Sequence, residues 1–170
     1  MLQSPRPSNK FVPTSQRERP ARMITGERGP QPEFPASEEV YRRFQAEHFI
    51  QNVLSNIGLP FPRASFNRQS LSEPDDVLWH DQENRRFEGW GVFAVTAAQT
   101  RMLLATGDRR ELTFDIEHDP LPLNYSHTEL KCVDVASREE VQIPSKMVRK
   151  AYRVELSRAA SERIIISPQM

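Results

Sequence analysis

Proline is distributed unevenly along the chain, and this distribution constrains the fold more than any other feature. Seven of the 14 prolines fall in the first 36 of 170 residues, at positions 5, 7, 13, 20, 30, 32 and 35. Proline fixes φ and lacks an amide hydrogen, so neither a helix nor a β-ladder propagates through so dense a run. The same segment has few apolar residues to offset the entropy lost on ordering. We therefore expect residues 1–36 to form an N-terminal arm, either disordered or ordered by a partner, and residues 37–170 to form the folded domain.

The arm can be interpreted in two ways. It carries six basic and three acidic residues, a net charge of +3, which suits a solvated leader. Alternatively, its widely spaced large apolar side chains become ordered on a protein partner and anchor the arm there. The second interpretation gives four candidate partner-binding residues: Phe11, Met23, Ile24 and Phe34.

The overall charge of the chain is balanced. There are 23 basic and 23 acidic residues, which gives no whole-protein field to attract nucleic acid or an anionic membrane. The single cysteine, Cys132, excludes an internal disulfide and a multi-cysteine zinc site, and its apolar neighbours favour a buried structural thiol. No segment approaches the ~20 apolar residues of a membrane span, and the N-terminus lacks the apolar core of a secretory signal. We expect a cytoplasmic protein that has no cofactor or metal and binds no membrane.

The apolar spacing after the arm predicts a helix over residues 38–57. Ser37 is a suitable N-cap, and Gly58 suits the left-handed position just past the last turn. Four apolar residues follow the i, i+3, i+4, i+7 rule of a helix face: Ile50, Val53, Leu54 and Ile57. Residues 59–88 then show no sustained period, so we expect a long loop that serves as a wall or lid.

The rest of the chain alternates between predicted strands and helices. Apolar periodicity predicts strands over residues 90–95, 111–118, 127–135 and 163–167, and helices over residues 97–105 and 144–160. In the second of these helices, Met147, Ala151 and Val154 share one face. We therefore predict an α+β fold with a single domain. It would contain a small mixed sheet of about four to five strands, packed by two to three helices.

Two histidines stand close together in the segment HDPLPLNYSHTEL, residues 118–130. His118 ends one predicted strand and His127 begins the next, and on a strand His127 shares a face with Glu129. Three chemistries suit these side chains: a general base at His127 oriented by Glu129, a metal held by all three, or an acid–base pair acting on a phosphodiester. A rigid structural turn explains the same residues. His127, His118 and Glu129 are therefore catalytic candidates under an enzymatic hypothesis alone.

Candidate substrate-binding residues come from two segments. Residues 63–76 offer guanidinium and amide groups that suit a phosphate or carboxylate, and the connection before His127 offers an amide and a phenol. The candidates are Arg63, Asn67, Arg68, Asn124 and Tyr125. The alternative is a polar surface loop whose side chains cap local turns.

The predicted C-terminal helix carries the best local basic patch. Four basic residues recur every three to four positions and so share one stripe: Lys146, Arg149, Lys150 and Arg153. Such a stripe is usually a solvated face, but it suits an acidic partner or a nucleic-acid backbone. Because the overall charge is balanced, nucleic acid is not favoured, and these four residues join the partner-binding candidates.

Two segments carry a resemblance to known proteins. SFNRQSLSEPDDVL (residues 65–78) and HDPLPLNYSHTEL (residues 118–130) resemble segments of a scattered group of small bacterial proteins of unassigned function. The resemblance covers about residues 60–135. It implies a bacterial, intracellular origin and carries no activity with it.

Two functional hypotheses follow from the sequence. No specific catalytic motif accompanies the proline-rich arm, so we favour a small accessory or binding module that acts within a protein complex and docks through the arm. The alternative is a His-dependent hydrolase or transferase acting on a phosphodiester or nucleotide. In that case His118, His127 and Glu129 do the chemistry, and an arginine binds the anion.

Overall fold

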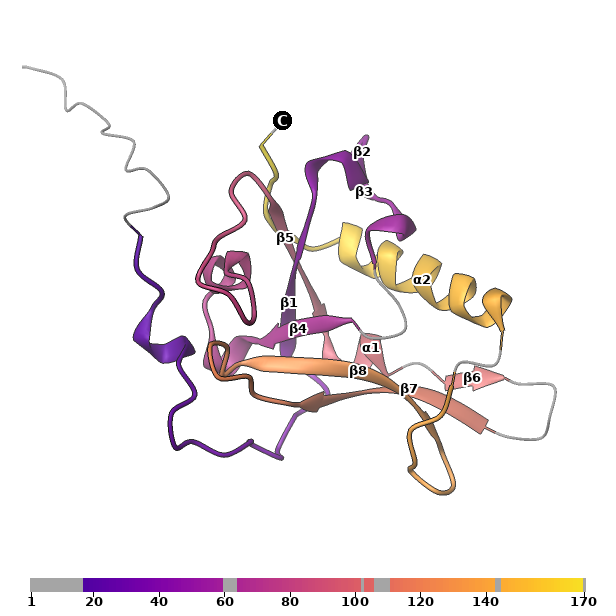
Figure 1. Ribbon diagram of the computed structural model, residues 1–170. Helices are drawn as coiled ribbons and strands as arrows, with labels where there is room; N and C mark the ends of the chain where they lie inside the picture. Colours follow the sequence, from indigo (N-terminus) through magenta and orange to yellow (C-terminus); the bar gives the residue numbers. More distant parts are fainter. Residues whose placement is uncertain (1–16, 60–63, 102, 106–110, 143–144, 170) are drawn as a thin grey trace, which may run out of the picture.

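A seven-stranded sheet forms the centre of the structure, a computed structural model that describes residues 17–59, 64–101, 103–105, 111–142 and 145–169 (Figure 1). Its strands are β1 (Glu39–Phe44), β4 (Ser65–Arg68), β5 (Gly91–Thr96), β6 (Leu103–Ala105), β7 (Glu111–His118), β8 (His127–Asp134) and β9 (Ile164–Ile166). Their order is β6-β7-β8-β4-β1-β5-β9, and every neighbouring pair is antiparallel. Two predicted site residues, Phe11 and Arg63, lie outside the described ranges.

The predicted combination of one sheet with few helices is confirmed, but the sheet differs in detail. It is wholly antiparallel rather than mixed, and it has more strands than the four to five expected, because β1, β4 and β6 come from segments predicted as helix or loop. In the described ranges it is accompanied by two α-helices, α1 (Ala97–Thr100) and α2 (Lys146–Ser161). The connections contain a small hairpin and short 3-10 helices: β2 (Phe49–Ile50), β3 (Val53–Leu54), η2 (Ala21–Met23), η3 (Ala46–His48), η4 (Asn56–Gly58), η5 (Gln69–Leu71) and η6 (Pro74–Leu78).

The predicted strands β5, β7, β8 and β9 are confirmed, and so is α2. A capping box also begins α1 as predicted, since Thr96 Oγ1 accepts a hydrogen bond from Gln99 N and Gln99 Oε1 accepts one from Thr96 N. The helix ends at Thr100 instead of residue 105, because residues 103–105 pair with β7 as β6.

The helix predicted over residues 38–57 is wrong. The segment forms β1, η3, the β2–β3 hairpin and η4. Gln51 and Asn52 both have positive φ, 51° and 64°, which is the backbone of a two-residue hairpin turn and incompatible with a helix. Of the four apolar residues that follow the helical spacing, only Leu54 is buried.

The long loop predicted over residues 59–88 is also wrong in part, since it contains the interior strand β4. This strand pairs with β1 on one side and β8 on the other. The sequence hides it because Asn67 and Arg68 are polar yet buried. Polar side chains stay buried at low cost when tertiary partners satisfy them, and both residues have such partners, described below.

The sheet is covered on both faces. The main core lies between one face and α2, and contains Phe44, Phe66, Phe93, Phe114 and Tyr152. The opposite face packs Tyr41 and Val92 against η6 and the segment leading to β5. The sheet is strongly twisted, so that β1 and β5 run in a clearly different direction from β7 and β8, and α2 lies within the resulting bend (Figure 1).

The helix α2 does not bury the face that carries Met147, Ala151 and Val154. Tyr152, Leu156 and Ala160 enter the core, and the Tyr152 hydroxyl donates to Thr100 O over 2.8 Å. Met147, Ala151 and Val154 are exposed instead. Both sets recur at helical spacing, and the larger aromatic area of Tyr152 favours its own face for burial.

The described part of the arm, residues 17–36, is folded onto the domain and runs along its side in Figure 1. Met23 is 1% exposed, and its carbonyl accepts a hydrogen bond from Tyr125 N over 2.7 Å. Arg19 donates to Leu123 O and to His80 O. Phe34 packs against the main core, whereas Ile24 is 41% exposed. Two of the predicted anchors, Met23 and Phe34, are therefore used within the chain itself.

Candidate functional site

The pairing of β4 with β8 joins the two segments that carry most of the predicted site residues. Asn67 is the cross-strand partner of His127, and Ser65 is the partner of Glu129. Asn124 Nδ2 donates to Asn67 Oδ1 over 2.8 Å. Segments about 60 residues apart in sequence thus share one end of the sheet.

A buried polar network continues from these two asparagines. Asn124 Nδ2 also donates to Asp81 Oδ1 over 2.8 Å, and Ser126 Oγ donates to Asn124 Oδ1 over 2.9 Å. Asp81 forms an ion pair with Arg43 of β1 over 3.1 Å. Burial alone would raise the pKa of Asp81, but Arg43 and the amide of Asn124 outweigh it and hold that pKa below its usual value. Asp81 is therefore ionised, and nearly all polar atoms of the network have hydrogen-bond partners, as is usual for a network that stabilises the fold.

One atom of this network has no partner. The Nδ2 of Asn67 is buried and meets no acceptor within the described residues. The Oδ1 of Asn67 accepts a hydrogen bond from Asn124 Nδ2, and the cross-strand partner of Asn67 is His127. We therefore treat the unsatisfied amide as a local cost of the network.

The two histidines are held by backbone groups. His127 Nδ1 donates to Asp119 O over 2.6 Å, so this nitrogen does not donate to Glu129, and Glu129 does not orient the ring through it. His118 Nδ1 accepts from Gln31 N over 2.7 Å, so its Nε2 carries the proton and donates to Tyr125 O over 2.6 Å. Burial lowers the pKa of His118, in keeping with a neutral ring.

The rings also lie on different faces of the sheet. His118 is the cross-strand partner of Thr128, the residue next to His127. Because side chains alternate along a strand, His118 and Thr128 share one face and His127 lies on the other, with Asn67 and Glu129. The predicted acid–base pair of imidazoles is not brought to a common ligand. The enzymatic hypothesis receives little support from this geometry.

Arg68 and Tyr125 hold the arm in place. The Arg68 guanidinium pairs with Glu38 and donates to Gln31 O and to Glu33 O, which leaves it engaged on all three nitrogens. The Tyr125 hydroxyl donates to Gly29 O over 3.2 Å, and the guanidinium of Arg28 lies 3.7 Å from the centre of its ring. Neither side chain offers the free donors that a substrate anion requires.

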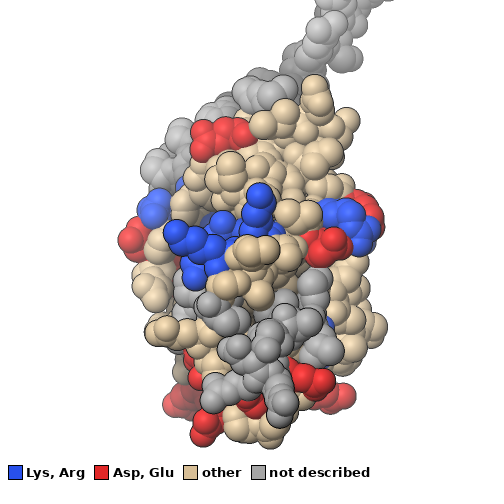
Figure 2. All heavy atoms as spheres, turned by 90° about the vertical axis from the view of Figure 1, so that its right-hand side faces the viewer, with Lys and Arg blue, Asp and Glu red and all other residues tan. Residues whose placement is uncertain are grey.

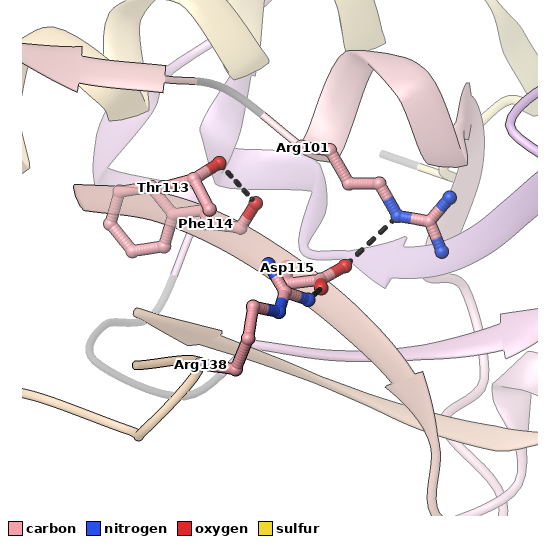
Figure 3. A pocket seen from close by; sticks show the side chains of 5 residues that line it. All are labelled: Arg101, Thr113, Phe114, Asp115 and Arg138. Carbon is pink, nitrogen blue, oxygen red and sulfur yellow. Dashed lines mark hydrogen bonds and ion pairs between the residues drawn. The ribbon is translucent and has the colours of Figure 1, made fainter. Parts of the chain in front are cut away.

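A shallow hollow of about 480 Å³ opens on the outer face of β7 (Figure 3). Arg101 at the end of α1 and Arg138 in the turn after β8 converge there on one carboxylate, Asp115. Arg101 Nε lies 2.9 Å from Asp115 Oδ1, and Arg138 bonds with Asp115 Oδ2. Arg138 has a φ of 62°, a left-handed conformation that a residue with a side chain adopts at a cost. These two ion pairs connect α1, β7 and the turn after β8.

The predicted basic stripe lies on the first two turns of α2 and just beyond. Lys146 and Lys150 are exposed, and Arg149 and Arg153 are partly buried. Figure 2 shows a group of basic side chains at the centre of the face that carries the start of α2. Large apolar side chains are exposed on the same helix and on the elements next to it, namely Met147, Val154, Ile50, Val53 and Ile57.

Sequence reasoning missed three of those exposed residues. Ile50, Val53 and Ile57 fit a helical period and were placed on a buried face. A signal for the hairpin was present, because Asn52 stands between the apolar pairs Phe49–Ile50 and Val53–Leu54, and asparagine tolerates the positive φ that a tight turn requires.

Within the described residues, no three side chains of His, Cys, Asp or Glu are grouped so that they could hold a metal ion. Among the helices of that same part of the chain, none combines the length and the apolar character needed to cross a lipid bilayer.

Comparisons with known proteins identify no family. The chain matches no protein-family model, and searches of curated proteins and of solved structures found no similar protein. Functional inference therefore starts from the geometry given above.

Proposed function

We propose that this protein is a binding module that docks onto an acidic partner protein through the outer surface of α2, the β2–β3 hairpin and η4. The observation that carries the proposal is the distribution of exposed large apolar side chains. Six are found in the described part of the chain, and five of them lie on these three elements. We call this set the docking surface, and its members are Ile50, Val53, Ile57, Met147 and Val154.

These five side chains are between 44% and 83% exposed, which costs free energy unless a partner covers them. Single exposed apolar residues are ordinary, but a group concentrated on neighbouring elements is typical of a protein interaction surface. Ile50 and Val53 are also cross-strand partners next to the hairpin turn, so their side chains lie side by side.

The docking surface is supported by a rigid base. The helix α2 packs against β3 and η4. Leu54 N donates to Ser161 Oγ over 2.9 Å, and the hydroxyl of Ser157 donates to Leu54 O, so the hairpin is fixed to the last turns of α2. A surface held in this way loses little entropy when a partner binds.

The charge around the docking surface indicates the chemistry of the partner. Residues 146–153 contain four basic residues and no acidic one, so the first half of α2 is strongly positive. The exposed ammonium groups of Lys146 and Lys150 flank Met147. An apolar segment with acidic residues would cover the apolar side chains and pair with these charges. We assign the docking role to this surface rather than to the arm, because Met23 and Phe34 of the arm already pack within the domain.

Site-specific photocrosslinking in cells tests the proposal. A photoreactive amino acid is placed at Met147 or at Ile57. The control position is Gln82, an exposed residue between η6 and β5 and outside the docking surface. We expect the same acidic protein to be captured from both positions and not from Gln82. Capture of a second copy of this chain alone, or of no protein, would contradict the proposal.

The captured protein is then purified and its affinity measured. Met147→Glu and Lys150→Glu should each weaken binding at least tenfold, because they place negative charge opposite an acidic surface. Gln82→Glu, which adds a negative charge elsewhere, should leave the affinity unchanged. Equal affinities for all three variants would show that the captured protein does not bind at the docking surface.

A further inference from the structure

Arg42 is a half-buried arginine whose Nε is shielded from solvent. It lies on β1, and its guanidinium reaches across to the neighbouring strand, where Nη1 donates to Ser65 O. Its Nε is buried and meets no acceptor within the described residues. None of the carboxylates described in the structure forms an ion pair with it, in contrast to Arg43 beside it, which pairs with Asp81.

This arrangement is energetically unusual. Burial, and to a smaller extent the neighbouring charge of Arg43, lower the pKa of Arg42 to about 10, and the carboxylate of Asp81 opposes this only in part. The guanidinium is still protonated at neutral pH. A desolvated cation is normally compensated by a carboxylate or by a bound anion, because leaving it unpaired is costly.

Arg42 lines a hollow of about 320 Å³ at the end of β1. Arg43, His48, Gly58, Phe87 and Trp90 are among the other residues around it. Two features suit a small ligand. The rings of Phe87 and Trp90 pack 4.6 Å apart and form an aromatic wall. Gly58 has no side chain, and a Cβ there would come within 3.0 Å of the His48 ring, so glycine lets η4 and the imidazole approach each other.

The charges around the hollow do not cancel. Arg43 donates to Val77 O, Trp79 O and Asp81, so the one carboxylate beside these two arginines is bonded to Arg43 and acts on Arg42 only through space. The unspent donors of Arg42 are those that a guanidinium uses to hold a phosphate.

We propose that this hollow binds a small phosphate-bearing molecule, with Arg42 holding the phosphate and the wall of Phe87 and Trp90 contacting an apolar or aromatic part. The hollow borders the docking surface, because Ile57 lines both. Arg42, Phe87 and Trp90 do not belong to the docking surface, so this proposal would stand if the partner interaction were disproved. It also involves neither histidine of the predicted catalytic group.

Thermal unfolding of the full-length protein with defined probes tests this site. We expect phenyl phosphate to raise the midpoint in a concentration-dependent manner, and inorganic phosphate to do so at concentrations at least tenfold higher, because it lacks the ring. Sodium chloride at matched ionic strength should have no comparable effect. A midpoint that rises equally with all three would indicate a general salt effect and overturn the proposal.

Arg42→Gln separates binding from stability. The variant should lose the response to phenyl phosphate, while its midpoint without ligand stays equal to or above that of the wild type, because a desolvated charge that forms no ion pair has been removed. Arg158→Gln, which removes an exposed positive charge from α2, is the matched control and should respond like the wild type. A lower midpoint of Arg42→Gln without ligand, together with no response of the wild type to phosphate, would assign Arg42 to the fold alone.

A second variant tests the aromatic wall. Trp90→Ala should remove the tenfold advantage of phenyl phosphate over inorganic phosphate, and leave the response to inorganic phosphate in place. Retention of the full advantage in Trp90→Ala would contradict the predicted contact with the ring.

Discussion

Both oxygens of the Glu38 carboxylate accept hydrogen bonds from the guanidinium of Arg68, Oε2 from Nη2 over 2.7 Å and Oε1 from Nε over 3.1 Å. The two side chains are almost wholly buried. Glu38 directly precedes β1, and Arg68 ends β4. Ser70 adds two further hydrogen bonds to the same carboxylate. The pair therefore joins the chain entering the sheet to the end of its central strand, and the carbonyls of Gln31 and Glu33 bind the arm to it.

Glu38→Gln should destabilise the protein by about 3–5 kcal/mol, because it leaves the buried guanidinium of Arg68 without a counter-charge. Urea unfolding at pH 7 measures this loss. Glu39→Gln is the matched control: Glu39 pairs with the exposed Arg163, and such surface pairs contribute little. Equal midpoints for the wild type and Glu38→Gln would contradict a stabilising role of the buried pair.

Acid should weaken the same pair. Burial would raise the pKa of Glu38, but the hydrogen bonds from Arg68 and Ser70 outweigh it, so the pKa lies below its ordinary value of 4.5. A carboxyl group with a lowered pKa stabilises the folded state above that ordinary value, and the contribution is lost as the pH falls towards the lowered pKa. We expect the urea midpoint to fall below about pH 4.5 in the wild type, with a smaller fall in Glu38→Gln.

His118 should make stability depend on pH in a different range. Its pKa is lowered from 6.5, chiefly by burial, so the unfolded chain binds a proton at a higher pH than the folded chain does. Stability is complete above pH 6.5 and declines as the pH falls from there towards the lowered pKa. Urea midpoints measured between pH 5 and pH 8 should therefore show a slope that His118→Gln reduces. The same slope in both proteins would assign it to other groups.

Met23→Ala should destabilise the protein by about 2–5 kcal/mol, the usual cost of removing a buried methionine side chain. The neighbouring Ile24 is 41% exposed, so Ile24→Ala should cost far less and serves as the control. The midpoint of thermal unfolding distinguishes the two variants. Similar, small effects of both would mean that the arm is not an integral part of the folded domain.

Gly91→Ala should destabilise the protein by about 1–3 kcal/mol through overpacking. A Cβ at Gly91 would lie 2.6 Å from Cε1 of the buried Phe44, its cross-strand partner. Gly29→Ala is the control, since no atom lies within 4 Å of a Cβ built there. Calorimetry of the three proteins measures the difference, and an unchanged midpoint for Gly91→Ala would show that the ring of Phe44 can move aside.

The sequence predicts those elements of the fold whose pattern is contained within a few consecutive residues. Leu112, Phe114 and Ile116 alternate cleanly along β7, and the capping box of Thr96 and Gln99 lies within four residues. The strand β1 escaped prediction because Arg42 faces the main core, which breaks the alternation expected of a half-buried strand. The strand β4 escaped prediction because it ends in a buried arginine, Arg68. The carboxylate that compensates this arginine, Glu38, lies 30 residues earlier in the sequence.

For the candidate site, too, local patterns could be predicted and contacts between distant residues could not. The sequence indicates candidate residues of one site in the segments around Asn67 and His127, but it does not predict that these segments pair as β4 and β8. The orientation of each histidine ring also depends on backbone carbonyls that no side-chain pattern reveals. The hollow beside Arg42 could not be predicted at all. An arginine within EVYRRF gives no sign of lacking an ion-pair partner until the carboxylates around it have been placed in space.

The packing of the arm has a consequence for synthesis. Arg19 bonds with a carbonyl that lies 104 residues later, and Met23 is held by Tyr125, so the N-terminal segment emerges from the ribosome long before the surface that covers it. Domains generally complete their folding as whole units, and apolar groups exposed in the meantime promote aggregation. A nascent chain stopped before Tyr125 would present Met23 uncovered, a mark by which chaperones and proteases could distinguish unfinished chains from finished ones.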